Sequence, residues 1–306
     1  MNPIVIRFGG YQKPASIHNR AAARFGEILK SRLGNRITFE LIGDVLALGR
    51  GSGDLLPMVG RGELSCCYIS TVRFTHAVPE FKLLELPFVV KSRPAITSAL
   101  DGELGDYLQR RVREATPFRV LGFWDNGFRH FSNCVRPLRL PADCRGLRIR
   151  TQMSALHGEV FRTLGFAPIP ADIKEFVAEI ATEKFQAQDN PLTNIYNFGV
   201  HNYHRHITLS GHFFGASALA FNDREYQSWP PDVRTIVDAA AVEATALQHR
   251  LAAAEDAEIL AKLNPRDNDV ISLTADEHAA FVKAVQPVMA KYRRELDSKL
   301  FAFLDR

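Results

Sequence analysis

The chain has 306 residues, of which 46% are hydrophobic and 24% charged, so it can bury substantial cores, and its length favours two lobes. Lys and Arg exceed Asp and Glu by only 38 − 34 = 4 and are spread along the sequence, which argues against a nucleic-acid-binding protein. No stretch approaches the roughly 18 to 20 apolar residues that cross a bilayer, and no basic segment followed by an apolar run opens the chain. If the protein is exported, we expect its signal to have been removed, so a periplasmic location stays compatible with this sequence.

The first part of the chain alternates between strand and helix patterns. We expect strands at 4–8, 37–41, 66–69 and 120–124, and helices at about 51–60 and 99–114 as well as one that Gly34 ends. The order strand, helix, strand, helix, strand predicts a parallel sheet. The strand that ends at Trp124 would close a first lobe near residue 125.

The rest of the chain predicts a second lobe and one long helix. A strand is expected at 147–150, with helices at about 154–164 and 172–183. From Pro230-Pro231-Asp232 the apolar residues keep helical spacing up to Asn264-Pro265, which predicts a helix of about 30 residues where about 11 to 12 is usual. We expect this helix to span both lobes. The stretch Thr274-Ala275-Asp276-Glu277 has the form of a capping box that opens a last helix.

These elements predict an α/β protein whose two lobes are each a mixed sheet flanked by helices. In the simplest arrangement the chain crosses between the lobes more than once. Residues 1–125 plus 212–250 would form lobe I, residues 126–211 plus 251–306 would form lobe II, and hinge strands would lie near 124–128 and 209–215.

Short blocks in the second lobe together indicate a receptor for a carboxylate, and their key residues are Arg129, Arg150 and Asn190. The block around Arg150 has a period of two, so Leu147 and Ile149 should face a core while Arg148 and Arg150 share the opposite face. A guanidinium is always charged, and its planar fork matches a carboxylate through two parallel hydrogen bonds. Arg150 taken alone would more often form a structural ion pair, and Arg148 is expected to be solvated.

Four cysteines form two sequence pairs. Cys66 and Cys67 are neighbours in an apolar strand and should pack as small apolar residues, because adjacent strand residues point to opposite faces. Cys134 and Cys144 flank a proline-rich turn, so a disulfide is an open alternative in an oxidising compartment. Neither pair has the Cys-x-x-Cys spacing of a zinc or redox site.

Several stretches follow the motifs of one family in order and spacing. They are Gly127-Phe128-Arg129-x-Phe131-Ser132-Asn133-x-x-Arg136-Pro137, Pro141-Ala142-Asp143-Cys144-Arg145-Gly146-Leu147-Arg148-Ile149-Arg150, Leu164-Gly165-Phe166-Ala167-Pro168-x-Pro170, Asp189-Asn190-Pro191-Leu192 and Trp229-Pro230-Pro231-Asp232. Over almost its whole length the chain resembles the solute-binding subunits of tripartite ATP-independent periplasmic (TRAP) transporters, the DctP family. The resemblance implies the type II periplasmic binding protein fold.

The resemblance also implies a function. Such a protein is a monomeric periplasmic receptor, without cofactor or metal, that captures a small organic acid in a cleft between its lobes and delivers it to TRAP membrane subunits. In the family the arginine at the Arg150 position pairs with the ligand carboxylate, and the Arg129 and Asn190 positions complete the second-lobe side. The matching first-lobe positions, together with further expected walls of the site, are Tyr11, Tyr68, Ser70, Arg73, Trp124, Ile173 and Phe213. Arg150, Ser70 and Trp124 all end predicted strands, which is where open α/β sheets bind ligands.

Departures from the family pattern narrow the expected ligand. Ser70 stands where members that bind sialic acids carry an acidic residue, and Met153 stands where they carry an amide, so a sialic acid is not expected. The aromatic walls fit an acid with an apolar or aromatic body, and Arg73 could hold a second carboxylate. Gln186-Ala187 and Glu183 also replace the usual acidic and glycine residues, so we expect the backbone there to differ.

Other candidate sites have weaker patterns. His201, His204, His206 and His212 could suggest zinc, but their spacing matches no zinc motif. Gly49-Arg50-Gly51-Ser52-Gly53 resembles a phosphate-binding loop, yet it lacks the Gly-Lys-Ser/Thr ending, so a turn before a helix is favoured.

An enzyme and a sensor are the alternative functions. His18, Cys66, Cys67 and Asp125 could supply a nucleophile and a base, but no local catalytic motif places them together. A sensor domain that reports ligand occupancy to a membrane partner would have the same ligand site as a transport receptor.

Overall fold

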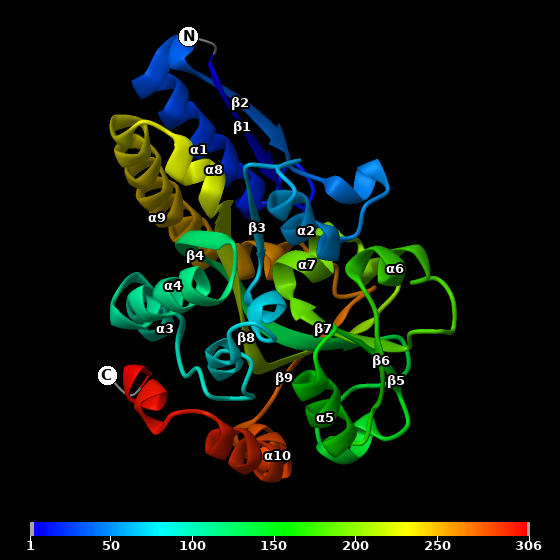
Figure 1. The fold of residues 1–306 in the computed structure, drawn as a ribbon. Helices are drawn as coiled ribbons and strands as arrows, with labels where there is room; N and C mark the ends of the chain where they lie inside the picture. The colour runs from blue at the N-terminus through cyan, green and yellow to red at the C-terminus, as the bar shows by residue number, and fades with distance from the viewer. Residues whose placement is uncertain (1–2, 305–306) are drawn as a thin grey trace. The chain divides into compact units, whose positions relative to one another are not determined.

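The computed structural model describes residues 3–304, which divide into two compact units (Figure 1). Unit 1 comprises the described part of Met1–Phe81 together with Thr97–Asp125 and Ala216–Ala253. Unit 2 comprises Lys82–Ile96, Asn126–Gly215 and the described part of Ala254–Arg306. The chain therefore passes from one unit to the other several times.

Some boundaries differ from those expected from the sequence. Residues 82–96 and 212–215 were expected in lobe I but belong to unit 2, and residues 251–253 were expected in lobe II but belong to unit 1. The segment 82–96 packs within unit 2, where the N–H of Phe88 donates to the carbonyl of His212 at 2.8 Å. The other shifts occur inside a continuous strand and a continuous helix, where no turn residue marks a boundary.

Unit 1 contains a largely parallel sheet, as the strand and helix order predicted. β1 (Ile4–Gly9) pairs in parallel with β2 (Ile37–Ile42) and with β3 (Cys66–Ser70). β3 then pairs antiparallel with the end of β8 (His206–Asn222), where Cys66 lies opposite Phe221. The helices of unit 1 are α1 (Ile17–Leu33), α2 (Leu55–Gly60), α4 (Glu103–Ala115) and α8 (Asp223–Ser228), and α3 (Arg93–Asp101) is divided between the two units after Ile96.

The single helix expected over 99–114 is instead two helices, α3 and α4, which meet at Gly102. A Cβ added to Gly105 would lie 1.8 Å from the carbonyl oxygen of Leu100. The first turn of α4 can approach the end of α3 this closely only because Gly105 has no side chain.

Unit 2 contains a mixed sheet built on the second half of β4 (Phe118–Asn133). β4 pairs antiparallel with β7 (Ala187–Pro191), and β7 pairs in parallel with β5 (Arg148–Thr151). β5 pairs in parallel with β6 (Ala167–Pro170), and β8 pairs in parallel with β9 (Asp269–Ser272). The helices here are α5 (Ala155–Thr163), α6 (Ile173–Ala178), α7 (Leu192–Asn197) and α10 (Ala275–Glu295). The strand expected at 120–124 is thus much longer, and the helix expected at 172–183 is shorter.

The long helix and the last helix are confirmed. α9 (Pro231–Lys262) has 32 residues, and these residues are shared between unit 1 and unit 2. α10 begins with the predicted capping box, in which the Thr274 hydroxyl accepts from the N–H of Glu277 and the Glu277 carboxylate accepts from the N–H of Thr274. Short 3-10 helices are found at Gly34–Arg36, Val45–Leu48, Ser52–Asp54, Thr71–Phe74, Pro79–Leu83, Pro141–Cys144, Val200–Asn202 and Ser298–Phe303.

The core of unit 1 is rich in aromatic rings. Phe8 stacks on Trp124 with ring centroids 6.1 Å apart and an interplanar angle of 16°. Tyr68 lies 5.6 Å from Trp124, and Phe25 lies 5.9 Å from Phe8. All these side chains are fully buried. Such aromatic pairs contribute about 0.5–1.5 kcal/mol each beyond the burial of their area.

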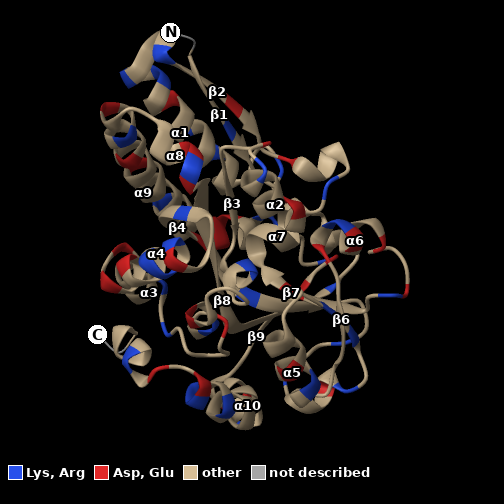
Figure 2. Cartoon of the chain, in the orientation of Figure 1, with Lys and Arg blue, Asp and Glu red and all other residues tan. Residues whose placement is uncertain are grey.

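Acidic and basic residues are interspersed along the helices of both units, as expected from the small net charge (Figure 2). In the part of the chain that the structure describes, no helix is both long and apolar enough to cross a membrane. All four cysteines are free thiols, so the disulfide alternative for Cys134 and Cys144 is not realised.

Candidate functional site

Strand register in unit 2 brings two of the three predicted carboxylate-binding residues to one face of the sheet. Arg150 of β5 lies opposite Gln188 of β7. Because alternate residues of a strand share a face, Asn190 projects on the same face as Gln188 and Arg150. Arg129 of β4 pairs diagonally with Asp189, whose side chain projects on the other face. The sequence pattern could not show this division, because it depends on the pairing of distant strands.

Arg150 is buried at the end of β5, with 4% of its surface exposed. Its Nε donates to the carbonyl of Ala171 at 2.9 Å, and its guanidinium carbon lies 5.8 Å from the ring centroid of Phe176. Ala171 follows β6 directly, and Phe176 lies in α6, so the neighbouring elements fix the plane of the guanidinium. Ile173, a predicted wall, is buried in the first turn of α6. A guanidinium held in this way is suited to bidentate recognition of a carboxylate.

Arg129 is also buried, and its guanidinium is held by Asp189. Its Nε lies 2.5 Å from Oδ2 of Asp189, and its Nη2 donates to the carbonyl of the same residue at 2.5 Å. On the other side, Nε2 of His212 lies 3.5 Å from Oδ2 of Asp189. Burial by itself raises the pKa of Asp189, but the charge of Arg129 and the hydrogen bond with His212 lower it more strongly, so this pKa lies well below the usual range. Arg129 therefore has a structural partner in addition to its predicted ligand.

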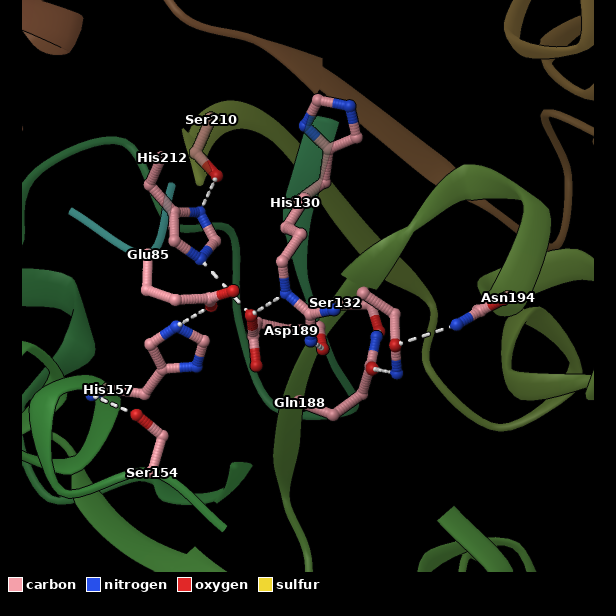
Figure 3. Close-up of polar contacts among 12 residues, drawn as sticks. Glu85, His130, Ser132, Ser154, His157, Gln188, Asp189, Asn194, Ser210 and His212 are labelled. Carbon is pink, nitrogen blue, oxygen red and sulfur yellow. Dashed lines mark hydrogen bonds and ion pairs between the residues drawn. The ribbon is translucent and has the colours of Figure 1, made fainter. Parts of the chain in front are cut away.

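Asn190 is held at both ends of its carboxamide. Its Nδ2 donates to Oε1 of Gln188, and its Oδ1 accepts from Nδ2 of Asn194 at 3.1 Å. Gln188 precedes it on the same face of β7. Asn194 lies in the first turn of α7, which begins directly after β7. Figure 3 labels Gln188 and Asn194, the two partners of this amide.

A second buried contact between a basic side chain and a carboxylate in unit 2 was not predicted. Nε2 of His157 lies 2.8 Å from Oε2 of Glu85 (Figure 3). The ring of His157 stacks on Phe213 with centroids 4.2 Å apart. Phe213, a predicted wall, therefore packs on His157. Ser154 caps α5 by accepting from the N–H of His157. This capping serine is a local sequence signal for the position of His157 in the first turn of α5. Glu85 is distant in sequence, and no pattern connects it with His157.

The first-lobe candidates Tyr11, Tyr68 and Trp124 lie in the core of unit 1. The hydroxyl of Tyr68 accepts from the N–H of Tyr11 at 3.2 Å and donates to Oδ1 of Asn19 at 3.1 Å. Nε1 of Trp124 donates to Oγ1 of Thr245 at 3.0 Å. The polar atoms of Tyr68 and Trp124 are thus used inside unit 1, and their proposed contribution to a ligand site is limited to the ring surface.

Ser70 and Arg73 follow the strand β3. Ser70 is half-buried at the last position of β3, and Arg73 lies in the 3-10 helix that follows it. Nη2 of Arg73 donates to Oγ of Ser52 at 3.2 Å. The segment 49–53 therefore forms a turn and helix start, as predicted, and Arg73 packs against it.

The histidines suggested by sequence for zinc have other partners. His204 and His212 lie next to serine hydroxyls, His206 lies 3.1 Å from Asp269, and His201 stacks on Tyr196. Within residues 3–304, no group of three or more His, Cys, Asp or Glu side chains is arranged to hold a metal ion.

The candidates for catalysis are also part of the core. Burial lowers the pKa of His18 to about 3, and its ring packs 5.1 Å from Tyr68. Burial raises the pKa values of Cys66 and Cys67 well above the usual range for a thiol. These groups are poor nucleophiles and bases at neutral pH.

Comparison with known proteins gives consistent matches along the whole chain. The sequence model of the family described as bacterial extracellular solute-binding protein, family 7 (DctP), matches residues 8–295. The C4-dicarboxylate-binding periplasmic protein DctP of Rhodobacter capsulatus is 26% identical over 302 residues, which cover 98% of this chain and 90% of that protein.

Solved structures share the fold. The sugar acid binding protein DctPAm from Advenella mimigardefordensis, in complex with galactonate, matches with a TM-score of 0.94 and 22% identity over 100% of this chain and 98% of that one. A TRAP periplasmic solute-binding protein from Shewanella oneidensis with bound succinate matches with a TM-score of 0.93 and 22% identity over 99% and 98% of the two chains.

Proposed function

We propose that this chain, which belongs to bacterial extracellular solute-binding protein family 7 (DctP), the solute-binding proteins of TRAP transporters, captures a small organic acid in the periplasm. The acid would then be delivered to the membrane subunits of a TRAP transporter. Relatives and structural neighbours named as binding C4-dicarboxylates, galactonate or succinate support an organic acid as the ligand class.

The observation that carries the proposal is the placement of Arg150. Its guanidinium is buried, its Nε is anchored on the carbonyl of Ala171, and Asn190 projects from the same face of the sheet. A charge-assisted hydrogen bond contributes about 1.5–3 kcal/mol, so a bidentate pair is the strongest directional contact that this face can offer an acid.

In the proposed site Arg150 would pair with the ligand carboxylate and Asn190 would donate to it. Arg129 remains a proposed contact, and its charge is balanced by Asp189 on the other face of the sheet. Tyr11, Tyr68, Ser70, Arg73, Trp124, Ile173 and Phe213 remain proposed contacts for the body of the ligand. We propose no catalytic step. His18, Cys66 and Cys67 lie in the core of unit 1, where burial lowers the pKa of the imidazole and raises the pKa values of the thiols, and no local motif joins Asp125 to them.

A thermal-shift and calorimetry screen tests the proposal. Wild type, Arg150→Ala and the control Arg139→Ala, which removes an exposed arginine paired with Glu277, would be titrated with succinate, L-malate, galactonate and erythronate. We expect at least one acid to stabilise wild type and the control, and to bind Arg150→Ala about tenfold more weakly or worse. Equal affinity of wild type and Arg150→Ala for that acid would remove the central claim.

A sensor with the same ligand site would give the same binding result, and only co-purification with TRAP membrane subunits would distinguish a transport receptor.

A further inference from the structure

The hydrogen bonds around Asn190 continue into a longer chain inside unit 2. Beyond Asn194 and Asn190, Nε2 of Gln188 donates to Oγ of Ser132 at 2.6 Å, and this oxygen lies 2.9 Å from Nδ1 of His204. None of these five side chains is more than 4% exposed. These hydrogen bonds thus connect α7, β7, β4 and the segment that precedes β8 (Figure 3 shows Asn194, Gln188 and Ser132).

The hydrogen-bond chain has a direction, because the nitrogen of each carboxamide donates to one neighbour and its oxygen accepts from the other. Turning the amide of Asn190 alone would set its nitrogen against the nitrogen of Asn194 and its oxygen against the oxygen of Gln188. Both hydrogen bonds would be lost inside the protein, where an unpaired polar group costs about 1–3 kcal/mol. Asn190 can therefore reverse only if its neighbours reverse with it.

His204 stands at the far end, where its ring tautomer decides whether Ser132 donates to Nδ1 or accepts from it. Ser132 accepts from Gln188, so its own proton is available for Nδ1 of His204 when the ring is neutral and carries its proton on Nε2. Burial lowers the pKa of His204 to about 4, which keeps the ring neutral near pH 7. Ser132 then has a fixed acceptor, and the order of donors along the chain is set from that end.

We infer that Gln188 and Asn194 are positioning residues that hold the Asn190 carboxamide in one orientation, so that its second N–H is presented to a ligand carboxylate. The inference rests on the proposed function. A carboxamide has two N–H donors, of which Gln188 uses one, and a carboxylate can only accept. The fixed orientation of Asn190 adds to the preference of the site for an acid over the matching carboxamide. The carboxamide carries N–H donors of its own, which cannot accept from the N–H of Asn190.

The test compares two asparagines of α7 that each donate to the side chain four residues earlier. Asn194→Leu removes the bond to Asn190, and the control Asn197→Leu removes the 3.1 Å bond from Nδ2 of Asn197 to Oγ1 of Thr193. Calorimetry would use those of succinate, L-malate, galactonate and erythronate that bind wild type, each with its carboxamide. We expect Asn194→Leu to weaken binding of the acid about tenfold and of the carboxamide less than twofold, and Asn197→Leu to change neither more than twofold.

The outcomes separate the inference from the proposed function. If an acid binds wild type and needs Arg150, but Asn194→Leu binds it unchanged or loses acid and carboxamide equally, the positioning role is wrong and the proposed function stands. If no acid binds wild type, both fail. A purely structural role of Asn194 would lower the thermal midpoint without changing the ratio of the two affinities.

A second measurement needs no variant and no ligand. Nitrogen-15 NMR of wild type at pH 7 reports which ring nitrogen of His204 carries the proton. We expect protonated Nε2 and unprotonated Nδ1. A proton on Nδ1 would free Ser132 to donate to Gln188, which would allow the whole chain to reverse, and it would overturn the inference even if Asn194→Leu failed to fold.

Discussion

Nε of Arg129 and Oδ2 of Asp189 lie 2.5 Å apart in a pair of side chains that are at most 2% exposed. Removing the carboxylate would leave a guanidinium buried without its anion, which typically costs about 3–5 kcal/mol. We therefore expect Asp189→Asn to lower the free energy of unfolding by about that amount, as measured by urea denaturation. The neighbouring His212, whose Nε2 lies 3.5 Å from Oδ2 of Asp189, would also lose the negative charge beside it.

The matched control is an ion pair at the surface. Asp232→Asn removes the partner of Arg36, in a pair whose side chains are 52% and 59% exposed. Exposed pairs contribute about 0–1 kcal/mol, so this variant should unfold almost like wild type. Similar losses in both variants would show that the Arg129–Asp189 pair is not the stabilising contact that its burial indicates.

Buried histidines predict that acid destabilises the protein well above the range of its carboxylates. Burial lowers the pKa of His18 and of His130 to about 3, and of His204 to about 4, whereas an unfolded histidine titrates near 6.5. The unfolded chain therefore takes up protons first. The stability from these groups is complete above pH 6.5 and falls as the pH drops toward the folded pKa, by about 1.4 kcal/mol per pH unit for each histidine.

Thermal midpoints between pH 7.5 and 5.5 check this prediction. His18→Gln should show a shallower decline with acid than wild type, because one of the titrating groups is gone. His249 provides the opposite sign: burial lowers its pKa, but hydrogen bonds to Asp101 and to the Phe123 carbonyl outweigh this and raise it. Its contribution is present at acid pH and is lost as the pH rises through the raised pKa, so His249→Gln should make the decline in acid steeper.

Elements with strong local signals could be predicted from the sequence. The spacing of apolar residues predicted the long helix α9, and the stretch from Thr274 to Glu277 predicted the capping box of α10. Both depend on neighbours within one or two helical turns. The strand at 147–150 was also recognised, because Leu147 and Ile149 alternate with Arg148 and Arg150.

Features that depend on distant pairings were missed. Asp189 belongs to a sequence motif, but no pattern in the sequence connects it with its partner Arg129, sixty positions earlier. The break between α3 and α4 depends on the approach of Gly105 to the Leu100 carbonyl, and a periodicity of apolar residues does not report it. For the candidate site, residue types could be predicted, whereas the face on which each side chain lies follows from the register of β4, β5 and β7.

Gly127 is a position where a side chain should be harmful. It lies in β4 with φ of +94°, and a Cβ there would lie 3.3 Å from Cβ of Pro191 and 3.4 Å from Nη2 of Arg93. We expect Gly127→Ala to destabilise the protein by about 1–3 kcal/mol, because the backbone is strained for any L-residue and the space is tight.

Gly60→Ala is the control for this substitution. Gly60 ends α2, and the nearest atom to an added Cβ is Cζ of Phe118 at 3.7 Å, an ordinary contact. Because alanine loses less entropy than glycine in a helix, the control should be neutral or stabilised by up to about 1 kcal/mol. The thermal midpoints of the two variants test this prediction. A Gly127→Ala variant as stable as wild type would mean that the backbone of β4 adjusts easily at this point.

Arg148 and Arg150 are separated by one residue, and we expect opposite effects from their removal. Nε of Arg148 donates to the carbonyl of Lys184 at 3.3 Å, and its Nη2 donates to that of Glu183, so it fastens the turn before β7. Arg148→Ala should therefore lower stability by about 1–2 kcal/mol, at the low end for charged hydrogen bonds because the side chain is partly exposed. The affinity for an acid should stay within twofold of wild type, whereas Arg150→Ala should lose affinity with a smaller change in stability. Urea denaturation and calorimetry on both variants give the two quantities separately. If Arg148→Ala lost acid binding but kept full stability, the ligand contact would belong to Arg148 and not to Arg150.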